Sequence, residues 1–254
     1  MMERGSYSAA AGMLSGQKAI NVLSQNVANV NTAGYKSQST IKGSFGEYLV
    51  SRMSMDPDIA QDGIGTGTYI TINDDQLTDF TQGSFQATGR SVDAAIQGQG
   101  FFVVQNANYG QVLTRNGQFE LDATGNLILP GVGNVLNSAG QPINLAGSDF
   151  TISANGTITQ NGAEVGQLYI ATVANGDDLT QVGEGFYQSQ AGIQAAQNGT
   201  YSIMQGTIER SNVDMTEEMS DIIAMQNNFS SCSQMLKIFD SIAEIAANKV
   251  GKLG

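Results

Sequence analysis

Few side chains in this sequence could carry out covalent chemistry. The chain has no histidine and a single cysteine, Cys232, which excludes a serine–histidine–aspartate triad, a histidine-based metal site and an intramolecular disulfide. Cys232 falls on a row of apolar residues at helical spacing, where a cysteine usually acts as a small buried hydrophobic residue. Any active site would therefore have to be built from carboxylates.

Two groups of aspartates could supply such carboxylates. The first resembles a calcium loop but lacks the EF-hand spacing and the closing glutamate, and it consists of Asp56, Asp58 and Asp62. The second could hold the paired carboxylates of a glycoside hydrolase, namely Asp74, Asp75, Asp79 and Asp93. The chain has no tryptophan to stack against a sugar, and a solvated acidic surface explains these residues more simply. We expect no enzyme activity, no metal site and no cofactor.

The composition favours a soluble protein that binds neither nucleic acid nor a membrane. Of the 254 residues 41% are hydrophobic, and no apolar run approaches the length of a membrane span. The net charge of -12 disfavours polyanionic partners, and the start of the chain shows no cleavable signal peptide. Residues 1–42 carry four basic and one acidic side chain, net +3, and residues 207–254 carry four basic and seven acidic ones, net -3. The two ends are electrostatically complementary.

The strongest pattern lies at the C-terminal end, over residues 211–253. Two apolar rows recur there every seven residues, as in a coiled-coil seam: Ile222, Phe229, Leu236, Ala243 and Val250, then Met225, Cys232, Phe239, Ala246 and Leu253. Asp214 is placed to cap the helix, with acidic residues in its first turn. The pattern predicts a helix of roughly 35 residues, which needs a partner helix to cover its seam.

The N-terminal end offers that partner. Residues 5–30 show the same spacing in Ala9, Met13, Ile20, Leu23, Val27 and Val30. Gly12 and Gly16 weaken this helix, but the small residues around Gly12 would allow close approach of another helix. We expect the two terminal helices to pair.

The middle of the chain has a β texture. Short apolar alternations are broken by turn dipeptides that suit hairpins, at Asn116–Gly117, Asn155–Gly156, Asn161–Gly162, Asn175–Gly176 and Asn198–Gly199. Buried strands are expected at 101–104, 127–129 and 168–173. The predicted fold class is α+β, with an antiparallel β domain over 75–206, an extended connector over 43–74, and a discontinuous coiled-coil-like helical domain formed by 1–42 and 207–254.

Four stretches of the chain resemble the signatures of the bacterial flagellar axial proteins, the rod and hook family. The N-terminal motif is matched by Asn26, Ala28, Asn29, Thr32, Gly34, Tyr35 and Lys36, with Tyr35 where phenylalanine is usual. The C-terminal motif is matched by Glu209, Ser211, Asn212, Val213, Asp214 and Glu218. Between them, residues 82–102 and 114–127 resemble the family's glycine-rich block and its next hairpin.

The resemblance implies a structural function. Proteins similar to this one leave the cell through the flagellar type III export apparatus and polymerise into the helical tube of the rod and hook, with paired terminal helices inside and the β domain outside. The implied partners are copies of the chain itself, other rod and hook proteins and the export apparatus, and the implied location is the flagellar basal body, outside the cytoplasmic membrane. The terminal segments are expected to be largely unfolded before export.

The sequence leaves two questions about the function open. The length favours a rod protein over the longer hook proteins, and within the rod proteins, whose motifs are shared, we expect the distal type. A proximal rod protein or a hook protein is the alternative within the family. From another class, an extracellular trimeric fibre or adhesin would also combine coiled coils with Gly/Asn-rich β modules.

Overall fold

The structure is a computed structural model that describes residues 2–51, 63–173, 179–190, 192–197 and 199–250. The chain divides into two compact units. Unit 1 comprises Met1–Ala28, Gln38–Asp79 and Asp214–Gly254, and unit 2 comprises Asn29–Ser37 and Phe80–Val213. The predicted fold class is confirmed, because terminal helices flank an antiparallel β domain.

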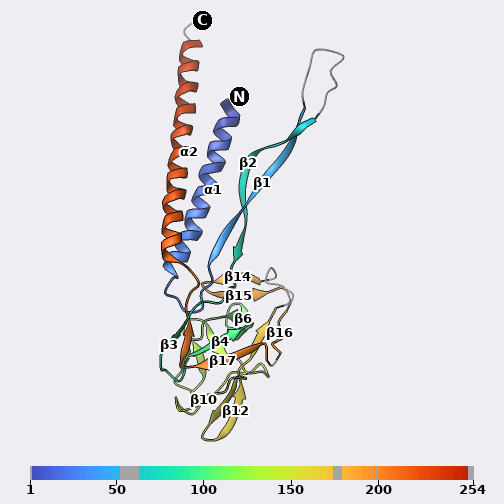
Figure 1. Cartoon of the computed structure of the whole chain (residues 1–254), viewed down its shortest axis with the longest axis vertical. Coiled ribbons are helices and arrows are strands. Elements are labelled where there is room, and N and C mark those ends of the chain that lie inside the picture. The colour runs from blue at the N-terminus through green and yellow to red at the C-terminus, as the bar shows by residue number, and fades with distance from the viewer. Residues whose placement is uncertain (1, 52–62, 174–178, 191, 198, 251–254) are drawn as a thin grey trace. The chain divides into compact units, whose positions relative to one another are not determined.

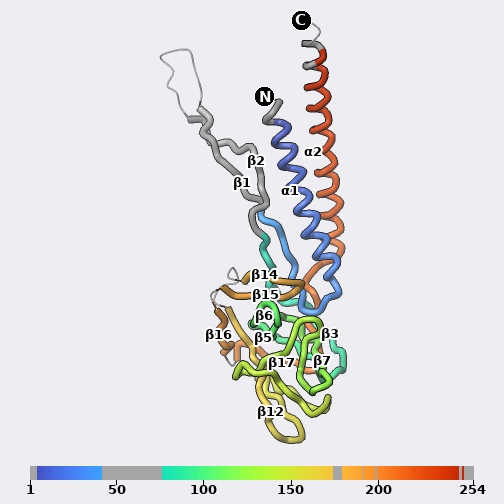
Figure 2. Tube along the Cα trace, turned by 180° about the vertical axis from the view of Figure 1, so that it is seen from behind, coloured from blue at the N-terminus to red at the C-terminus, as the bar shows by residue number. Residues whose placement is uncertain are grey.

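Unit 1 is built on two long helices that run antiparallel, α1 (Met2–Ala28) and α2 (Met215–Val250). Figures 1 and 2 show the two helices side by side from opposite directions. Asp214 caps α2, since its Oδ1 accepts hydrogen bonds from the backbone N–H groups of Thr216 at 2.8 Å and Glu217 at 3.4 Å.

Small residues of α1 set its distance from α2. A Cβ atom on Gly5 would lie 2.6 Å from the Phe239 ring, and one on Gly12 would lie 3.0 Å from the Cys232 sulfur. The predicted close approach at Gly12 is thus present. The line of contact follows the predicted seam of α2, where six residues are partly buried: Ile222, Met225, Phe229, Cys232, Leu236 and Phe239.

Beyond Phe239 the seam is no longer covered. Ala243 is exposed, because Phe239 already lies opposite Gly5, close to the start of α1. The side chains of Ala246 and Val250 lie outside the described residues.

On α1 the predicted seam residues are partly buried, and they are Met13, Ile20, Leu23 and Val27. The most buried line runs beside them, through Ala19, Val22 and Asn26. The reason is that α1 contacts a β-hairpin as well as α2.

That hairpin consists of β1 (Gln38–Ser51) and β2 (Gly63–Thr78), paired antiparallel from Gln38 opposite Thr78 to Ser51 opposite Gly63. The described part of the expected extended connector over 43–74 therefore lies in these two paired strands. The expected calcium loop at Asp56, Asp58 and Asp62 lies outside the described residues.

Unit 2 contains the remaining strands of the described chain. They are β3 (Phe85–Ala87), β4 (Ala94–Gly98), β5 (Phe101–Asn106), β6 (Gly110–Thr114), β7 (Glu120–Leu121), β8 (Leu127–Leu129), β9 (Gly133–Val135), β10 (Thr151–Ile152), β11 (Thr157–Gln160), β12 (Ala163–Gln167), β13 (Ile170–Thr172), β14 (Leu179–Gly183), β15 (Phe186–Ser189), β16 (Gln194–Ala195), β17 (Tyr201–Gln205) and β18 (Thr207–Glu209). The largest sheet runs β14-β15-β6-β5-β9-β8-β7, with β13 beside β5 and β16 beside β13. Strand β17 pairs with β4, and β18 pairs with β3.

The core of unit 2 lies on both faces of β5. Because side chains alternate along a strand, Phe102 and Val104 join one buried apolar cluster, while Phe101 and Val103 join another. The Phe102 ring meets Phe119 edge-on, with 5.0 Å between centroids. Both the expected buried strand at 101–104 and the one at 127–129 are present.

The turn predictions had mixed outcomes. Asn161–Gly162 forms the predicted two-residue hairpin turn, with both residues at positive φ. Asn155–Gly156 lies in a longer hairpin loop between β10 and β11. The prediction at Asn116–Gly117 is wrong, because the strands on either side of it do not pair with each other: β6 pairs with β5 and β15, and β7 pairs with β8. The Gly117 carbonyl instead accepts a hydrogen bond from the backbone N–H of Ala94. Asn175–Gly176 and Asn198 lie outside the described residues.

Candidate functional site

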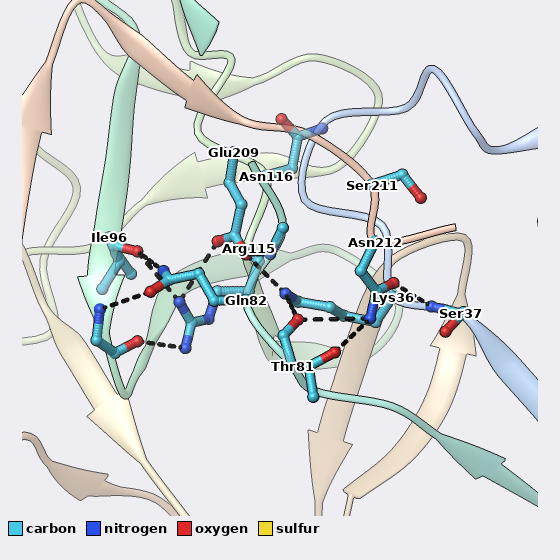
Figure 3. A network of polar contacts seen from close by, with 12 residues as sticks. Lys36, Ser37, Thr81, Gln82, Ile96, Arg115, Asn116, Glu209, Ser211 and Asn212 are labelled. Carbon is cyan, nitrogen blue, oxygen red and sulfur yellow. Dashed lines mark hydrogen bonds and ion pairs between the residues drawn. The ribbon is translucent and has the colours of Figure 1, made fainter. Parts of the chain in front are cut away.

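Both terminal signatures and the middle signatures of the chain meet at one carboxylate in unit 2, that of Glu209 at the end of β18. Its side chain is fully buried. Figure 3 shows Lys36 and Arg115 approaching the Glu209 carboxylate from different segments. We call this set of contacts, with the segments that carry them, the Glu209 network.

The Glu209 carboxylate accepts hydrogen bonds from three donors. Its Oε1 accepts from Lys36 Nζ at 2.6 Å and from the backbone N–H of Gly83 at 2.9 Å, and its Oε2 accepts from Arg115 Nη1 at 3.4 Å. Lys36 is 1% exposed and Arg115 6%. A buried charge needs both ion pairing and hydrogen bonds to offset the loss of water, and this arrangement supplies both.

The two cations are also satisfied by carbonyl oxygens. Lys36 donates to the Thr81 carbonyl at 2.7 Å, and Arg115 donates to the carbonyls of Ile96 at 3.2 Å and Gly98 at 2.8 Å. Burial lowers the pKa of Arg115, while the Glu209 carboxylate acts in the opposite direction. The guanidinium stays charged at any ordinary pH.

Two backbone N–H groups add further hydrogen bonds to the same network. The N–H of Gly34 donates to the Glu209 carbonyl at 2.8 Å, and the N–H of Ser37 donates to Asn212 Oδ1 at 2.8 Å. Gly34 has a φ of 69°, and a Cβ atom there would lie 2.3 Å from the backbone of Arg115. Only glycine suits both its conformation and its close contact.

A second motif contact lies in unit 1, at Asn26 near the end of α1. The Asn26 side chain accepts from the N–H of Gln38 at 3.0 Å and donates to the Gln38 carbonyl at 2.8 Å. It also donates to Glu218 Oε1 on α2 at 2.9 Å. One fully buried amide thus joins α1, α2 and the first residue of β1.

The environment of Glu218 perturbs its titration. Partial burial raises the pKa of its carboxyl, the hydrogen bond from Asn26 lowers it, and the neighbouring Asp221 and Glu217 raise it further. The net direction is upward, so the folded protein holds a proton at Glu218 more readily than the unfolded chain does.

The remaining motif residues form local contacts within the N-terminal and C-terminal motif segments. Asn29 is buried and its Oδ1 accepts from the Thr32 hydroxyl at 3.0 Å, which forms the turn after α1. Tyr35 is buried, whereas Ala28 is exposed. At the other end, the Ser211 hydroxyl accepts from the N–H of Val213 at 3.3 Å.

Arg115, Thr81 and Gly83 are among the residues of the network that were not expected as site residues from the sequence. The sequence does contain a signal for Arg115, because this residue directly follows β6, whose last three residues are buried, and a charge at such a place needs a buried partner. Thr81 contributes its carbonyl oxygen, and a backbone acceptor leaves no signal in a sequence.

The suggested carboxylate pair of an enzyme is not formed by the described residues. Asp93 is buried and accepts a hydrogen bond from the Thr88 hydroxyl at 2.6 Å, and Asp79 is exposed. The side chains of Asp74 and Asp75 lie outside the described residues. Within the described chain, no group of acidic, cysteine or histidine side chains is arranged to hold a metal ion, and no helix could span a membrane.

Helix α2 also exposes large apolar side chains. Near its start a first stripe, exposed by 44 to 59%, consists of Met215, Met219 and Ile223. Near its end a second stripe, exposed by 39 to 58%, consists of Met235, Ile238, Ile242 and Ile245. Met215 falls on the seam row itself, in line with Ile222. At about 100° per residue, the first stripe as a whole lies about 110° from the middle of the seam in one direction and the second about 130° in the other, so the two stripes are about 120° apart around the helix axis.

Comparisons with known proteins match all of these regions. Residues 95–160 match the family model for the flagellar hook protein FlgE/F/G D1 domain. Residues 7–36 match the flagella basal body rod protein model, and residues 204–249 match the model for the C-terminal part of the flagellar basal body rod FlgEFG proteins. The chain is thus an axial protein of the flagellum, of the class that includes rod and hook proteins.

The individual relatives of this chain include several rod proteins. The flagellar basal-body rod protein FlgG of Bacillus subtilis is 32% identical over 97% of this chain and 99% of the relative. FlgG of Agrobacterium fabrum is 30% identical over 95% and 97%, and FlgF of Caulobacter vibrioides is 26% identical over 100% and 99%. The chain belongs to the family of flagellar basal-body rod proteins, which are structural and not enzymatic.

Proposed function

We propose that this chain is a distal-type structural subunit of the flagellar rod that polymerises through its terminal helices into an open-ended helical tube. The observation that carries the proposal is the pair of exposed apolar stripes on α2. Contiguous exposed apolar surface on a protein usually marks an interface. Copies of the same chain are the partner we assign to these stripes.

The size of the stripes is sufficient to drive association. Seven large apolar side chains stand about half exposed, and burying such a side chain fully contributes about 1.5–3 kcal/mol. Even half of that, summed over the stripes, exceeds about 5 kcal/mol before the entropy of association is subtracted.

Their placement favours an open polymer over a closed dimer. The stripes lie at opposite ends of α2 and about 120° apart around its axis, so one self-complementary contact cannot cover both. Each copy then needs different neighbours at its two stripes. Heterologous contacts of this kind extend into helical filaments when the rotation does not close.

The resemblance and the relatives support the rest of the proposal. We assign the paired helices of unit 1 to the inner tube and the β strands of unit 2 to the outer layer. Other rod and hook proteins would be the neighbours at the ends of the segment, and the flagellar type III export apparatus would deliver the subunit beyond the cytoplasmic membrane. The FlgG relatives favour the distal type.

A stripe variant tests the proposal. Ile238→Gln, Ile242→Gln and Ile245→Gln together remove most of the second stripe without adding charge. The matched control changes two exposed apolar residues of unit 2, Tyr109→Gln and Val165→Gln. Sedimentation velocity should show assembly of the control at the concentration of the unmodified chain, and of the stripe variant only at a concentration at least about tenfold higher. Equal assembly of both variants would contradict the proposed interface.

A further inference from the structure

The chain passes between its two compact units at four places: after Ala28, Ser37, Asp79 and Val213. In unit 2 these crossings belong to three segments, residues 29–37, 80–84 and 207–213. Nothing about the chain's order in sequence requires these segments to touch. Each could leave unit 2 from a separate place.

All three segments are instead bonded to one another within unit 2. The first contacts the third through Lys36 and Glu209, through the N–H of Gly34, and through the N–H of Ser37. The second contacts the third as well, since the N–H of Gly83 donates to Glu209 and the N–H of Arg210 donates to the Ser84 carbonyl at 2.8 Å.

The second segment also contacts the first, because the Thr81 carbonyl accepts a hydrogen bond from Lys36. In addition, the Thr81 hydroxyl accepts a hydrogen bond at 3.1 Å from Asn212 Nδ2, which belongs to the third segment. Every pair among the three segments is therefore joined directly. Figure 3 shows these bonds converging, with Thr81, Lys36 and Asn212 close together beside Glu209.

The network meets the apolar clusters that hold the β strands together at Arg115, whose guanidinium lies 5.3 Å from the centroid of the Phe101 ring and donates to the Ile96 carbonyl. None of the described members of those two clusters is Lys36, Thr81, Glu209 or Asn212. The contacts of Glu209 also join residues far apart along the chain, 173 positions to Lys36 and 126 to Gly83. Such contacts close long loops and contribute little to the local strand pairs.

We infer that the Glu209 network is a clasp, which binds together, within unit 2, the three segments through which the chain enters and leaves that unit, in place of three independent tethers. Glu209 is its central residue, because its carboxylate and carbonyl together hold the other two segments. The inference rests on contacts within unit 2 and does not depend on polymerisation.

The clasp predicts that the three segments open together when its centre is weakened. Glu209→Gln keeps the side-chain shape but removes the charge that balances two buried cations, and it places an amide N–H₂ toward Arg115, itself a donor. Asn212→Ala is the milder variant, which removes the bonds to Ser37 and Thr81. Glu184→Gln, an exposed glutamate of unit 2, is the matched control.

Hydrogen exchange of the full-length chain, followed by mass spectrometry, measures the opening. The amides of Gly34, Ser37, Gly83 and Arg210 are themselves donors in the clasp. Glu209→Gln should raise exchange in all three segments by at least about tenfold, while β5 and β6 stay protected and the control is unchanged.

Two results would overturn the inference. If only peptides containing residue 209 exchange faster, the segments are independent tethers. If β5 and β6 lose protection equally, the network is part of the common core of unit 2. Should Glu209→Gln fail to fold, Asn212→Ala decides the question: faster exchange in both 34–37 and 81–84 supports the clasp, and a change confined to 211–213 refutes it.

Discussion

Replacing Gly34 by alanine tests the structure of the N-terminal motif most sharply. Gly34 has a φ of 69°, and its Cβ atom would lie 2.3 Å from both the Arg115 carbonyl carbon and the Asn116 nitrogen. The left-handed conformation costs about 1–2 kcal/mol for alanine. The overlap adds about 1–3 kcal/mol, because backbone atoms cannot turn aside as a side chain can. We expect Gly34→Ala to lower the free energy of unfolding of unit 2 by about 3 kcal/mol.

Gly110→Ala is a control with the same conformation and no clash. Gly110 has a φ of 72°, and no atom lies within 4 Å of its added Cβ, so it should lose only about 1 kcal/mol. Urea titrations of the full chain, read by hydrogen exchange in residues 101–114, give both values. If the two variants lose the same amount, the motif does not pack against Arg115, and the reasoning is refuted.

Three further predictions concern unit 1. Gly16→Ala should raise the melting temperature of the helices in circular dichroism, because its Cβ would have an ordinary 3.7 Å contact and alanine favours helix by about 1 kcal/mol. Gly12→Ala should raise the melting temperature less, because its Cβ would lie 3.0 Å from a sulfur atom. An equal increase in both variants would contradict the close approach of α2 at Gly12. Asn26→Ala should destabilise unit 1 by about 1–3 kcal/mol, since it leaves both polar groups of Gln38 without this partner; an unchanged urea midpoint would count against that role. The pKa of Glu218 is raised in the folded state, so this residue contributes stability at low pH that is lost as the pH rises. At pH 7, Glu218→Gln should therefore unfold at a higher urea concentration than the unmodified chain, and the difference between the two urea midpoints should narrow toward pH 5. A difference that widens on acidification would show that the pKa of Glu218 is lowered on folding.

The parts of the fold set by local pattern were predictable. The seven-residue rows and the position of Asp214 predict α2 almost to its first residue, and the alternation around Phe102 predicts a strand with two buried faces. Asn161–Gly162 predicts its turn because that turn type needs positive φ at two adjacent residues.

The parts set by distant contacts were not predictable. Lys36 and Glu209 were expected in a helical terminal domain, yet the structure groups both with the β strands of unit 2. Their charges had suggested complementary ends, and their ion pair is one such contact, but the periodicity of a single sequence cannot show that residues 173 positions apart share a buried site. Asn116–Gly117 failed for the same reason, since the partner of Gly117 is Ala94.

The central claim is that the full-length chain is a subunit of an open polymer. Light scattering coupled to size exclusion, over a wide range of protein concentration, tests it most directly. We predict a monomer when dilute and a mass that increases with concentration without reaching a limit, with open-ended filaments visible by electron microscopy. A fixed trimer at every concentration would contradict the claim and favour a closed extracellular fibre.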